Sequence, residues 1–367
     1  MRGLNLAGME GGYGVEVEAD VVVPGQWGQA LGPRADIDYP VFPEALIDFY
    51  RSKNVGVLRL PFSWERLQSE LWGPVPAAGA RYVSYFEHYR RVVDYATGLG
   101  MVVIVVPWQA DAEDGVGGVM WRGRPVGPGG LDIFAFADLW AKLAAVFRDR
   151  PLVQYGLVNE PNSMSTMVWW QTAQKCVDAI RAAGATSTIH VPGNGWTGAG
   201  SWTADWYDAA TPKRSNAYGW LNANGEGAPL FDPLGKCVAD VHLYLDEDAG
   251  GRSDTLAGPA VARDRLSVAV TEATARGYQV FVGEIGLYAG APGAPAAWAD
   301  FLACVTENAA TCIGFAWWAG GKPGWWDDVH AAHFSVTPTG DTVNMDLIEA
   351  SFAPAPAAPV GVPGGGA

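Results

Sequence analysis

The sequence predicts an α/β fold, a single (β/α)8 TIM barrel. Short β-branched apolar runs alternate along the chain with amphipathic helical stretches, and eight such runs can be counted. Most of the runs are too apolar to have one face in water, which favours a parallel sheet covered by helices on all sides. A length of 367 residues suits one such barrel with insertions, and closing the sheet removes both of its edges.

Eight segments of strand length carry the apolar runs. They are rich in Val, Ile and Leu, the composition expected of strands buried on both faces. In chain order they are Leu4–Ala7, Gly56–Leu60, Val102–Val106, Val153–Val158, Thr188–Val191, Val238–His242, Val280–Gly283 and Ile313–Trp317.

Six helices are predicted from apolar residues at helical spacing. The clearest begins after Asp132, a favourable N-cap residue, and has one apolar face formed by Phe136, Leu139, Trp140, Leu143 and Phe147. The region 197–237 is rich in Gly, Trp and Asn and shows little helical periodicity, and a long loop precedes the last helix. The other five helices are expected at Phe42–Ser52, Val83–Ala96, Met164–Ala183, Ala260–Ala275 and Ala296–Glu307.

The composition favours a neutral ligand over a nucleic acid or a membrane. Apolar residues make up 49% of the chain, but no run of about 18 uncharged apolar residues could span a bilayer. A net charge of −15 with 24 Lys and Arg lacks the clustered cations that a phosphate backbone requires. We therefore expect a monomer that binds neither nucleic acid nor membrane.

The sequence does not predict a metal or another cofactor. The five histidines show no ligand spacing beyond His330 and His333, which are interpreted as a loop pair. No Cys-x-x-Cys pair occurs, which argues against a structural zinc site. Cys304 and Cys312 could close a small disulfide loop in an oxidising compartment, or all four cysteines could be buried thiols.

The two ends of the chain differ from the barrel in composition. Residues 1–352 are expected to form the barrel domain, whereas 353–367 contain Ala, Pro, Gly and two Val without a charge and predict an extended tail or linker. No hydrophobic signal region follows Met1. The expected location is secreted or periplasmic, with a leader already removed.

Seventeen tryptophans are more than a core needs. Their flat apolar faces and polar edges suit stacking on sugars, although ordinary loop packing is the alternative for each of them. As a set they favour a carbohydrate-binding site. Many adjoin Gly, Pro or Asp in stretches that resemble loops: Trp72, Trp108, Trp121, Trp196, Trp202, Trp325 and Trp326.

The residues at the predicted strand ends are almost all polar or aromatic. In a (β/α)8 barrel the loops after the strands build the active site, so these residues are the first candidates. Glu160 and Glu284 each follow an apolar run directly, which is the layout of a two-carboxylate glycosidase. The other candidates are Arg59, Asn159, Asn194, Trp196, His242, Tyr244 and Trp318.

At these positions the chain resembles glycoside hydrolase family 5, and more narrowly its cellulase-like endoglucanases. The resemblance covers nearly the whole chain, and the order of its motifs is more specific than any one of them. The motifs are Gly-Leu-Asn-Leu-Ala-Gly at 3–8, Leu-Arg-Leu-Pro-Phe-Ser-Trp-Glu-Arg-Leu at 58–67, Asn-Glu-Pro at 159–161, Val-Pro-Gly-Asn-Gly-Trp at 191–196, Val-His-Leu-Tyr-Leu-Asp at 241–246, Gly-Glu-Ile-Gly at 283–286 and Trp-Trp-Ala-Gly-Gly at 317–321.

The resemblance implies an endo-acting retaining glycosidase acting on a β-linked glucan. It implies Glu160 as general acid and base and Glu284 as nucleophile. The surrounding shell that it implies consists of Arg59, Asn159, His242, Tyr244 and Trp318.

Physical chemistry agrees with these implied roles. A retaining site needs two carboxyl groups about 5 to 5.5 Å apart, one protonated and one ionised. Arg59 is expected to favour the charged form of Glu284, while Glu160 holds its proton longer beside a second negative charge.

The shell residues have roles of the same kind. Asn159 could donate to a substrate hydroxyl, Tyr244 could bond the nucleophile, and Trp318 could form the floor of the reacting sugar's subsite. The alternatives are a structural ion pair for Arg59, a satisfied core imidazole for His242 and a packing role for Trp318.

One segment departs from the family pattern. After the third strand the family usually carries a His-Asn pair, whereas this chain has Trp108 and Gln109. Trp108 cannot accept a hydrogen bond and fills more space, while Gln109 could replace the lost amide. This difference leaves both candidate carboxylates in place, but it affects which substrate the site is predicted to bind.

Other functions remain compatible with the sequence. A mannan, a xylan or a mixed-linkage glucan could be the substrate, and the enzyme could be a transglycosylase, because loop residues set the choice of sugar. From another class, the chain could be a glycan-binding protein whose altered third loop has abolished turnover.

Overall fold

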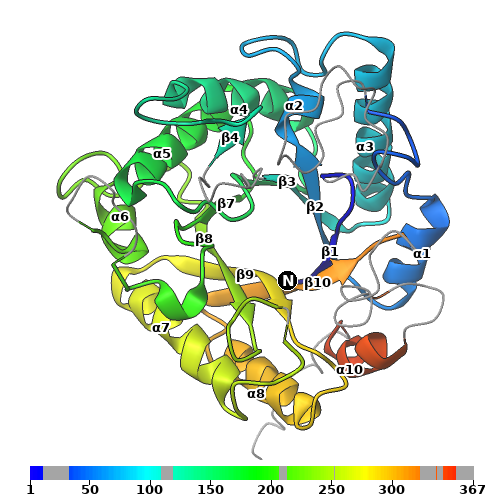
Figure 1. The fold of residues 1–367 in the computed structure, drawn as a ribbon, viewed down its shortest axis with the longest axis vertical. Coiled ribbons are helices and arrows are strands. Elements are labelled where there is room, and N and C mark those ends of the chain that lie inside the picture. The colour runs from blue at the N-terminus through cyan, green and yellow to red at the C-terminus, as the bar shows by residue number, and fades with distance from the viewer. Residues whose placement is uncertain are drawn as a thin grey trace, which may run out of the picture.

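The predicted (β/α)8 barrel is confirmed. The computed structural model describes residues 1–10, 33–108, 119–205, 213–251, 253–322, 336 and 342–352. Eight parallel strands close in the order β1-β10-β9-β8-β7-β6-β3-β2, surrounded by helices (Figure 1). They are β1 (Arg2–Leu6), β2 (Val57–Ser63), β3 (Val102–Trp108), β6 (Val153–Gly156), β7 (Ile189–Pro192), β8 (Cys237–Tyr244), β9 (Gln279–Gly286) and β10 (Cys312–Gly320).

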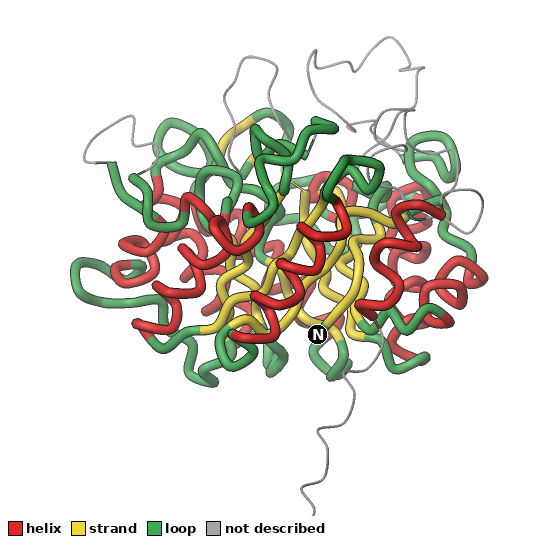
Figure 2. Tube along the Cα trace, turned by 90° about the horizontal axis from the view of Figure 1, so that it is seen from below, coloured by secondary structure: helices red, strands yellow, loops and turns green. Residues whose placement is uncertain are grey.

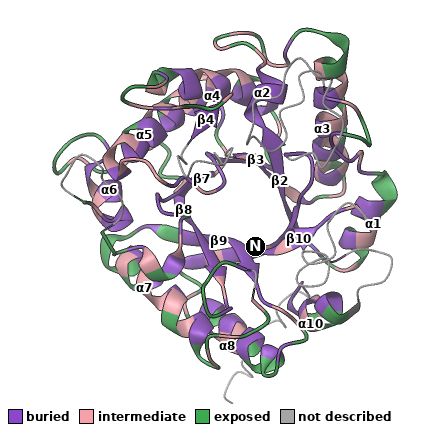
Figure 3. Cartoon of the chain, viewed as in Figure 1, coloured by how far each residue is buried: buried purple, intermediate pink, exposed green. Residues whose placement is uncertain are grey.

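All six predicted helices are present, with ends shifted by a few residues. They are α1 (Glu44–Ser52), α3 (Ala80–Gly98), α4 (Ile133–Phe147), α5 (Thr166–Ala182), α7 (Val261–Arg276) and α8 (Ala294–Glu307), and α10 (Thr342–Phe352) is the last helix among the described residues. Buried residues lie on the strands and on the barrel-facing sides of the helices, and exposed residues lie mainly on the periphery (Figure 3).

The α4 helix shows why the sequence pattern was informative. The side chain of Asp132 accepts a hydrogen bond from the backbone N–H of Phe134 at 2.9 Å, which satisfies a donor that the first turn leaves open. The predicted apolar face is buried in full, because it packs against the barrel: Phe136, Leu139, Trp140, Leu143 and Phe147.

The region 197–237 contains short elements that periodicity did not reveal. The helix α6 spans only Asn216–Asn222 and is capped by the Ser215 hydroxyl, which accepts from the N–H of Tyr218 at 3.1 Å. Within α6, Gly219 packs directly against the Trp170 indole. Aromatic contacts therefore hold this helix, and they include its own Trp220, which stacks on Tyr278 with ring centroids 4.3 Å apart. The short elements η1 (Ala199–Ser201) and α2 (Trp64–Leu67) were also not predicted.

The loop after the third barrel strand contains a small hairpin. Its strands β4 (Met120–Trp121) and β5 (Arg124–Pro125) pair antiparallel. The N-terminus lies at one end of the barrel, and the longer loops gather at the opposite end (Figure 2). These are the loops that follow the strands, so the candidate site residues share one end of the molecule.

Several further predictions can be compared with the structure. The four cysteines are free thiols, so the Cys304–Cys312 disulfide is not formed. None of the described helices is long and apolar enough to cross a membrane. The predicted tail at 353–367, together with Trp325, Trp326, His330 and His333, lies outside the described residues.

Replacing Gly219 by Ala tests the packing of α6. An added Cβ would lie 1.9 Å from Cδ1 of Trp170, so one of the two elements must move. Overpacking of this kind costs about 1–3 kcal/mol. We expect Gly219→Ala to lower the free energy of unfolding by that amount in urea denaturation. Gly98→Ala in α3 is the control, because its Cβ would meet nothing within 4 Å, and equal stabilities of the two variants would contradict the packing argument.

Candidate active site

Four elements bring the candidate side chains together. Arg59 lies on β2 and His242 and Glu284 lie on β8 and β9, where the register pairs these two residues directly. Glu160 follows β6 in the loop that begins at Leu157. These strands are separated in sequence but share one closed barrel, so their ends converge.

The two glutamates lie close enough to share a ligand. One carboxylate oxygen from each of Glu160 and Glu284 and one ring nitrogen of His242 all lie within 4.8 Å of one another. His242 Nδ1 is 2.6 Å from Glu160 Oε1 and 3.4 Å from Glu284 Oε2. This spacing suits the shorter of the two carboxylate separations found in glycosidases.

Arg59 is the centre of the hydrogen-bond network. It has no exposed surface, and its Nη1 donates to Asn159 Oδ1 at 2.8 Å, to Asn5 Oδ1 at 2.9 Å and to Glu284 Oε1 at 3.1 Å. Its Nη2 lies 3.6 Å from Asp240 Oδ2. The structural ion pair considered from the sequence therefore exists, and the same guanidinium also contacts the candidate nucleophile.

Donor chemistry fixes the tautomer of His242. A guanidinium can only donate, so Arg59 Nη2, 3.4 Å from His242 Nε2, requires an acceptor at that nitrogen. Burial lowers the pKa of His242 to about 4, although Glu284 raises it, so the ring is neutral near pH 7. The single ring proton then resides on Nδ1 and is donated to Glu160 Oε1. His242 is a satisfied imidazole, as one alternative stated, but the group that it satisfies is a candidate catalytic carboxylate.

The pKa of Glu284 moves opposite to the direction expected from Arg59 alone. Burial raises this pKa to about 7, and the charge of Glu160 adds to the increase. His242, Arg59 and the Tyr244 hydroxyl, which donates to Glu284 Oε2 at 2.6 Å, lower it. The arginine acts in the predicted direction, but Glu284 is 2% exposed and the cost of burying its charge is larger. With a pKa of about 7, Glu284 is protonated in a substantial fraction of molecules at neutral pH.

Two tryptophans stack at the mouth of the barrel. The rings of Trp108, at the end of β3, and Trp318, on β10, have centroids 5.4 Å apart and planes 27° apart. The strands β1 and β2 lie between β3 and β10 in the barrel, so the two side chains reach across them. A sugar that stacks on Trp318 must use the face turned away from Trp108 or displace Trp108, because sugar and ring need about 3.5–4 Å between their carbons.

The other aromatic candidates divide into two groups. Trp196 is 44% exposed, and its backbone N–H donates to the carbonyl of Pro161, next to Glu160, at 3.2 Å. Trp202 and Trp121 are buried and donate their indole N–H to Tyr278 and Gln68, so ordinary packing accounts for these two. Gln109 lies outside the described residues.

The structure adds two site residues and reassigns one. Asn5 and Asp240 both contact Arg59, but neither was selected from the sequence. Each is a polar residue inside an apolar strand, and Asp240 precedes His242 by two positions, which places both on one face of the strand. Asn194 is buried and donates to the carbonyl of Met164 and the hydroxyl of Thr166, so it braces a loop.

The carboxylate and imidazole atoms at this site would be possible metal ligands. Glu160, His242 and Glu284 are the candidate ligand group found among the described residues. A cation would have to displace the proton between His242 and Glu160, because a ligating nitrogen must be unprotonated. This proton and the Tyr244 hydroxyl already satisfy the oxygens that a metal would use. The chemistry of this group favours proton transfer over metal binding.

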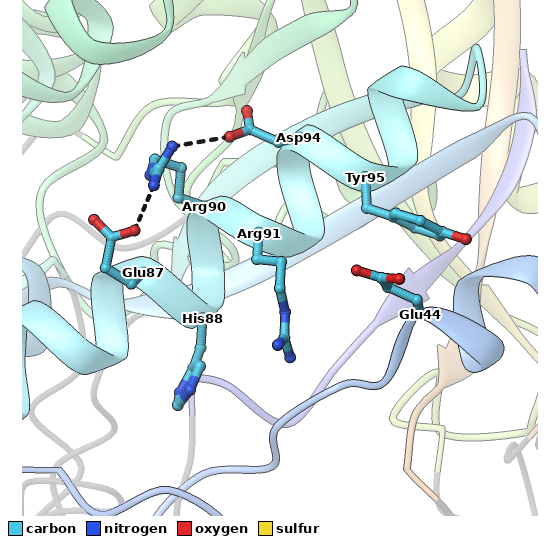
Figure 4. A pocket seen from close by; sticks show the side chains of 7 residues that line it. All are labelled: Glu44, Glu87, His88, Arg90, Arg91, Asp94 and Tyr95. Carbon is cyan, nitrogen blue, oxygen red and sulfur yellow. Dashed lines mark hydrogen bonds and ion pairs between the residues drawn. The ribbon is translucent and has the colours of Figure 1, made fainter.

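A separate hollow of about 550 Å³ lies on the outside of the barrel, between α1 and α3. Arg90 forms ion pairs with Glu87 and Asp94 beside it (Figure 4). The hollow contains none of the predicted site residues, and the positive and negative charges of its side chains largely compensate each other. Its lining consists of Glu44, Glu87, His88, Arg90, Arg91, Asp94 and Tyr95.

The raised pKa of Glu284 predicts how pH affects stability. Between its ordinary pKa near 4.5 and about 7, the folded chain holds a proton that the unfolded chain has lost, so stability falls as pH rises through this window. Glu284→Gln removes this loss. We expect the difference in free energy of unfolding between Glu284→Gln and the wild type to shift in favour of the variant by up to about 3 kcal/mol as the pH rises from 4.5 to 8.

Denaturation at a series of pH values measures this effect. Glu10, whose pKa burial also raises to about 7, adds a slope of the same sign to both proteins and cancels in the difference. Glu226→Gln replaces an exposed carboxylate and is the control, with a flat difference expected. A flat difference for Glu284→Gln as well would refute the burial argument.

Comparison with known proteins agrees with this geometry. Residues 27–321 match the cellulase family, glycosyl hydrolase family 5. The chain is 30% identical to endo-beta-1,4-glucanase A of Emericella nidulans over 303 residues, which covers 82% of this chain and 79% of the other. It is 29% identical to endoglucanase gh5-1 of Neurospora crassa over 351 residues, which covers 95% and 76%.

Solved structures show the same architecture. An endo-beta-1,4-glucanase of Xanthomonas axonopodis pv. citri superimposes with a TM-score of 0.78 at 27% identity and covers 96% of this chain and 98% of its own. XacCel5A in complex with cellopentaose gives a TM-score of 0.78 at 26% identity, with the same coverage. The family match spans the strands from β2 to β10 and the motifs from residue 58 to 321. The chain belongs to glycosyl hydrolase family 5, the cellulase family.

Proposed function

We propose that the protein is a retaining endo-β-1,4-glucanase that acts by double displacement, with Glu284 as nucleophile and Glu160 as general acid and base. The observation that carries the proposal is the meeting of these two carboxylates within 4.8 Å, each held by a specific donor. The names of the relatives and the cellopentaose bound to XacCel5A support a glucan chain as substrate.

The surroundings of the two carboxylates support different roles. Arg59 and Tyr244 donate to separate oxygens of Glu284, which orients the carboxylate and stabilises its anionic form for attack. The Glu160 side chain is 19% exposed, against 2% for Glu284, so it can exchange protons with the leaving group and with water. His242 donates to Glu160 and stabilises its ionised form after it has given up a proton.

The first half-reaction forms a glycosyl-enzyme. A Glu284 oxygen attacks the anomeric carbon, and the glycosidic C–O bond breaks with its electron pair passing to the leaving oxygen. That oxygen takes the proton of Glu160, and the shortened glucan departs. Asn159 is suited to binding the 2-hydroxyl of the reacting sugar, because its Oδ1 accepts from Arg59 while its buried Nδ2 has no hydrogen-bond partner among the described residues.

The second half-reaction restores the enzyme. Glu160, now ionised, takes a proton from a water molecule whose oxygen attacks the same anomeric carbon. The ester bond breaks, its electron pair returns to Glu284, and Glu160 holds a proton again. Two inversions at one carbon leave the product with the configuration of the substrate.

The stacked pair Trp108 and Trp318 supports a reshaped sugar subsite. Trp318 offers an indole face for the reacting sugar, and Trp108 fills the space of the family's usual histidine. The exposed Trp196 lies on the Glu160 side and is suited to stacking on the leaving portion of the chain. Gln109 is proposed to supply an amide to the same subsite.

A polymeric substrate also supports the remaining assignments. An insoluble or very long glucan does not enter a cell, so we assign the enzyme to the secreted or periplasmic space. It works as a monomer, in which residues 1–352 form the catalytic domain and 353–367 form a linker or tail.

Replacing each glutamate tests the two roles. We expect Glu284→Gln to lose about 10⁴-fold or more of kcat on every glucan, because no other group can form the ester. We expect Glu160→Ala to lose about 10²–10⁴-fold on cello-oligosaccharides but far less in the first step on a dinitrophenyl cellobioside, whose leaving group needs no proton.

Proton NMR of the first product provides the stereochemical test, with the β-anomer expected. An α-anomer would show inversion and exclude a nucleophilic role for Glu284. Full turnover by Glu284→Gln would have the same consequence. A panel of β-1,4, β-1,3 and mixed-linkage glucans, mannan and xylan distinguishes the glucanase from the other substrate classes, and binding to the panel without release of reducing ends would indicate a glycan-binding protein.

The role of Trp108 can be tested by its removal. Trp108→Ala exposes one face of Trp318 and removes a wall of the subsite, so we expect KM for cellopentaose to rise about tenfold while kcat changes less. Trp202→Phe is the control, because Trp202 is buried and bonded to Tyr278 away from the carboxylates. An unchanged KM in Trp108→Ala would show that Trp108 serves packing alone.

A further inference from the structure

Asp240 is a buried carboxylate beneath the candidate site. It has no exposed surface, and neither of its oxygens accepts a well-aligned hydrogen bond from the described residues, although the Gly283 N–H and the Arg59 guanidinium lie near enough to favour its charged form. Its partner is Arg59, with Nη2 at 3.6 Å from Oδ2. A buried carboxylate without hydrogen bonds costs stability, so its presence calls for another explanation.

The backbone around Asp240 is shaped to receive it. A Cβ added to Gly283, the residue before Glu284, would lie 2.0 Å from Asp240 Oδ1. Because Gly283 has no side chain, the Asp240 carboxylate fits beside the strand that carries Glu284. Thr197 also donates its hydroxyl hydrogen to the Asp240 carbonyl at 2.5 Å, which fixes the strand at this residue.

The charge of Arg59 must be balanced in two different states. In the free enzyme Glu284 and Asp240 are the carboxylates in ionic contact with Arg59, considering the described residues. When Glu284 forms an ester with the sugar, it loses its negative charge while Arg59 stays fully buried. An unpaired buried guanidinium is strongly unfavourable, so the ester state requires a second anion.

We propose that Asp240 is the permanent counter-ion of Arg59, a positioning residue that keeps the guanidinium paired and aimed while Glu284 is bonded to the sugar. This inference rests on the proposed double displacement. Asp240 contacts the Nη2 edge of Arg59, and the Nη1 edge bonds Glu284 and Asn159. The two edges of the Arg59 guanidinium can therefore be paired with different anions at the same time.

The other titratable groups near Arg59 are less suited to this task. His242 and Tyr244 on β8 are neutral near pH 7, because burial lowers the pKa of the first and raises that of the second. Glu160 is bonded to His242 and changes its own charge during the cycle. Glu10, after β1, accepts from the N–H of Gly8. Burial raises its pKa to about 7, and Arg66 opposes this increase more than Arg59 does.

The groups around Asp240 favour its charged form, in opposition to burial. Burial raises the pKa of Asp240, and Arg59, His242 and the Gly283 backbone oppose the increase. Without the charge of Asp240, Arg59 would form its ion pair with Glu284 alone. The Glu284 anion would then be bound more tightly, which lowers its pKa and makes it a weaker nucleophile.

Asp240→Asn tests the proposal in the full-length enzyme. The probes are dinitrophenyl cellobioside, whose leaving group needs no acid, and its 2-fluoro analogue, which traps the glycosyl-enzyme for mass spectrometry. We expect the trapping rate and kcat to fall at least tenfold, KM to stay within about twofold, and the acid limb of kcat/KM to move to lower pH. A merely structural residue would not shift that limb.

Asp232→Asn is the matched control. Asp232 forms a buried ion pair with Arg181 far from the carboxylates, so its loss should reduce stability and leave the trapping rate and the pH profile unchanged. If the wild type forms the trapped ester and Asp240→Asn shows the same trapping rate and the same acid limb, the counter-ion role alone is overturned. Failure of the wild type to form the trapped ester would overturn both this role and the double displacement.

Gly283→Ala gives an independent test of the same contact. Its Cβ would displace the Asp240 carboxylate, so it should reproduce the slow trapping of Asp240→Asn. In an Asp240→Ala background the clash is absent, and the added methyl group should cause little further loss. Strictly additive losses in the double variant would contradict the coupling.

Discussion

The buried positive charge of Arg59 is the constraint on which the site depends. A guanidinium without exposed surface is tolerated only when its charge is paired and most of its N–H groups have acceptors. Glu284 and Asp240 pair the charge, and Asn5 and Asn159 accept hydrogen bonds. The same contacts orient Glu284 and fix the His242 tautomer, and through His242 they extend to Glu160.

Closure of the barrel makes this convergence possible. Arg59 comes from β2, whereas His242 and Glu284 come from strands on another part of the wall. Parallel strands end on the same side, so side chains at their carboxyl ends meet without adjacent positions in the chain. Helices that bury full apolar faces, such as α4, supply stability that offsets the burial of Arg59, Asp240 and Glu284.

Burial also sets the proton chemistry. It raises the pKa of Glu284 and lowers that of His242, so a carboxylic acid and a neutral imidazole can coexist near pH 7. Comparable shifts would be absent in water, because solvation of the charged forms would restore ordinary values. The site therefore holds a carboxyl group whose pKa lies near neutrality, which favours proton transfer at that pH.

The sequence by itself determined the barrel, its eight strands and its six main helices, because apolar periodicity and caps such as Asp132 are local signals. It also indicated Glu160, Glu284 and Arg59 through their positions at strand ends. The short helix α6, the Trp108–Trp318 stack and the Asp240–Arg59 contact were decided by the tertiary structure. Each depends on the distance between residues remote in the chain, as does the pKa of Glu284, which follows from burial by the whole barrel and not from its neighbours in sequence.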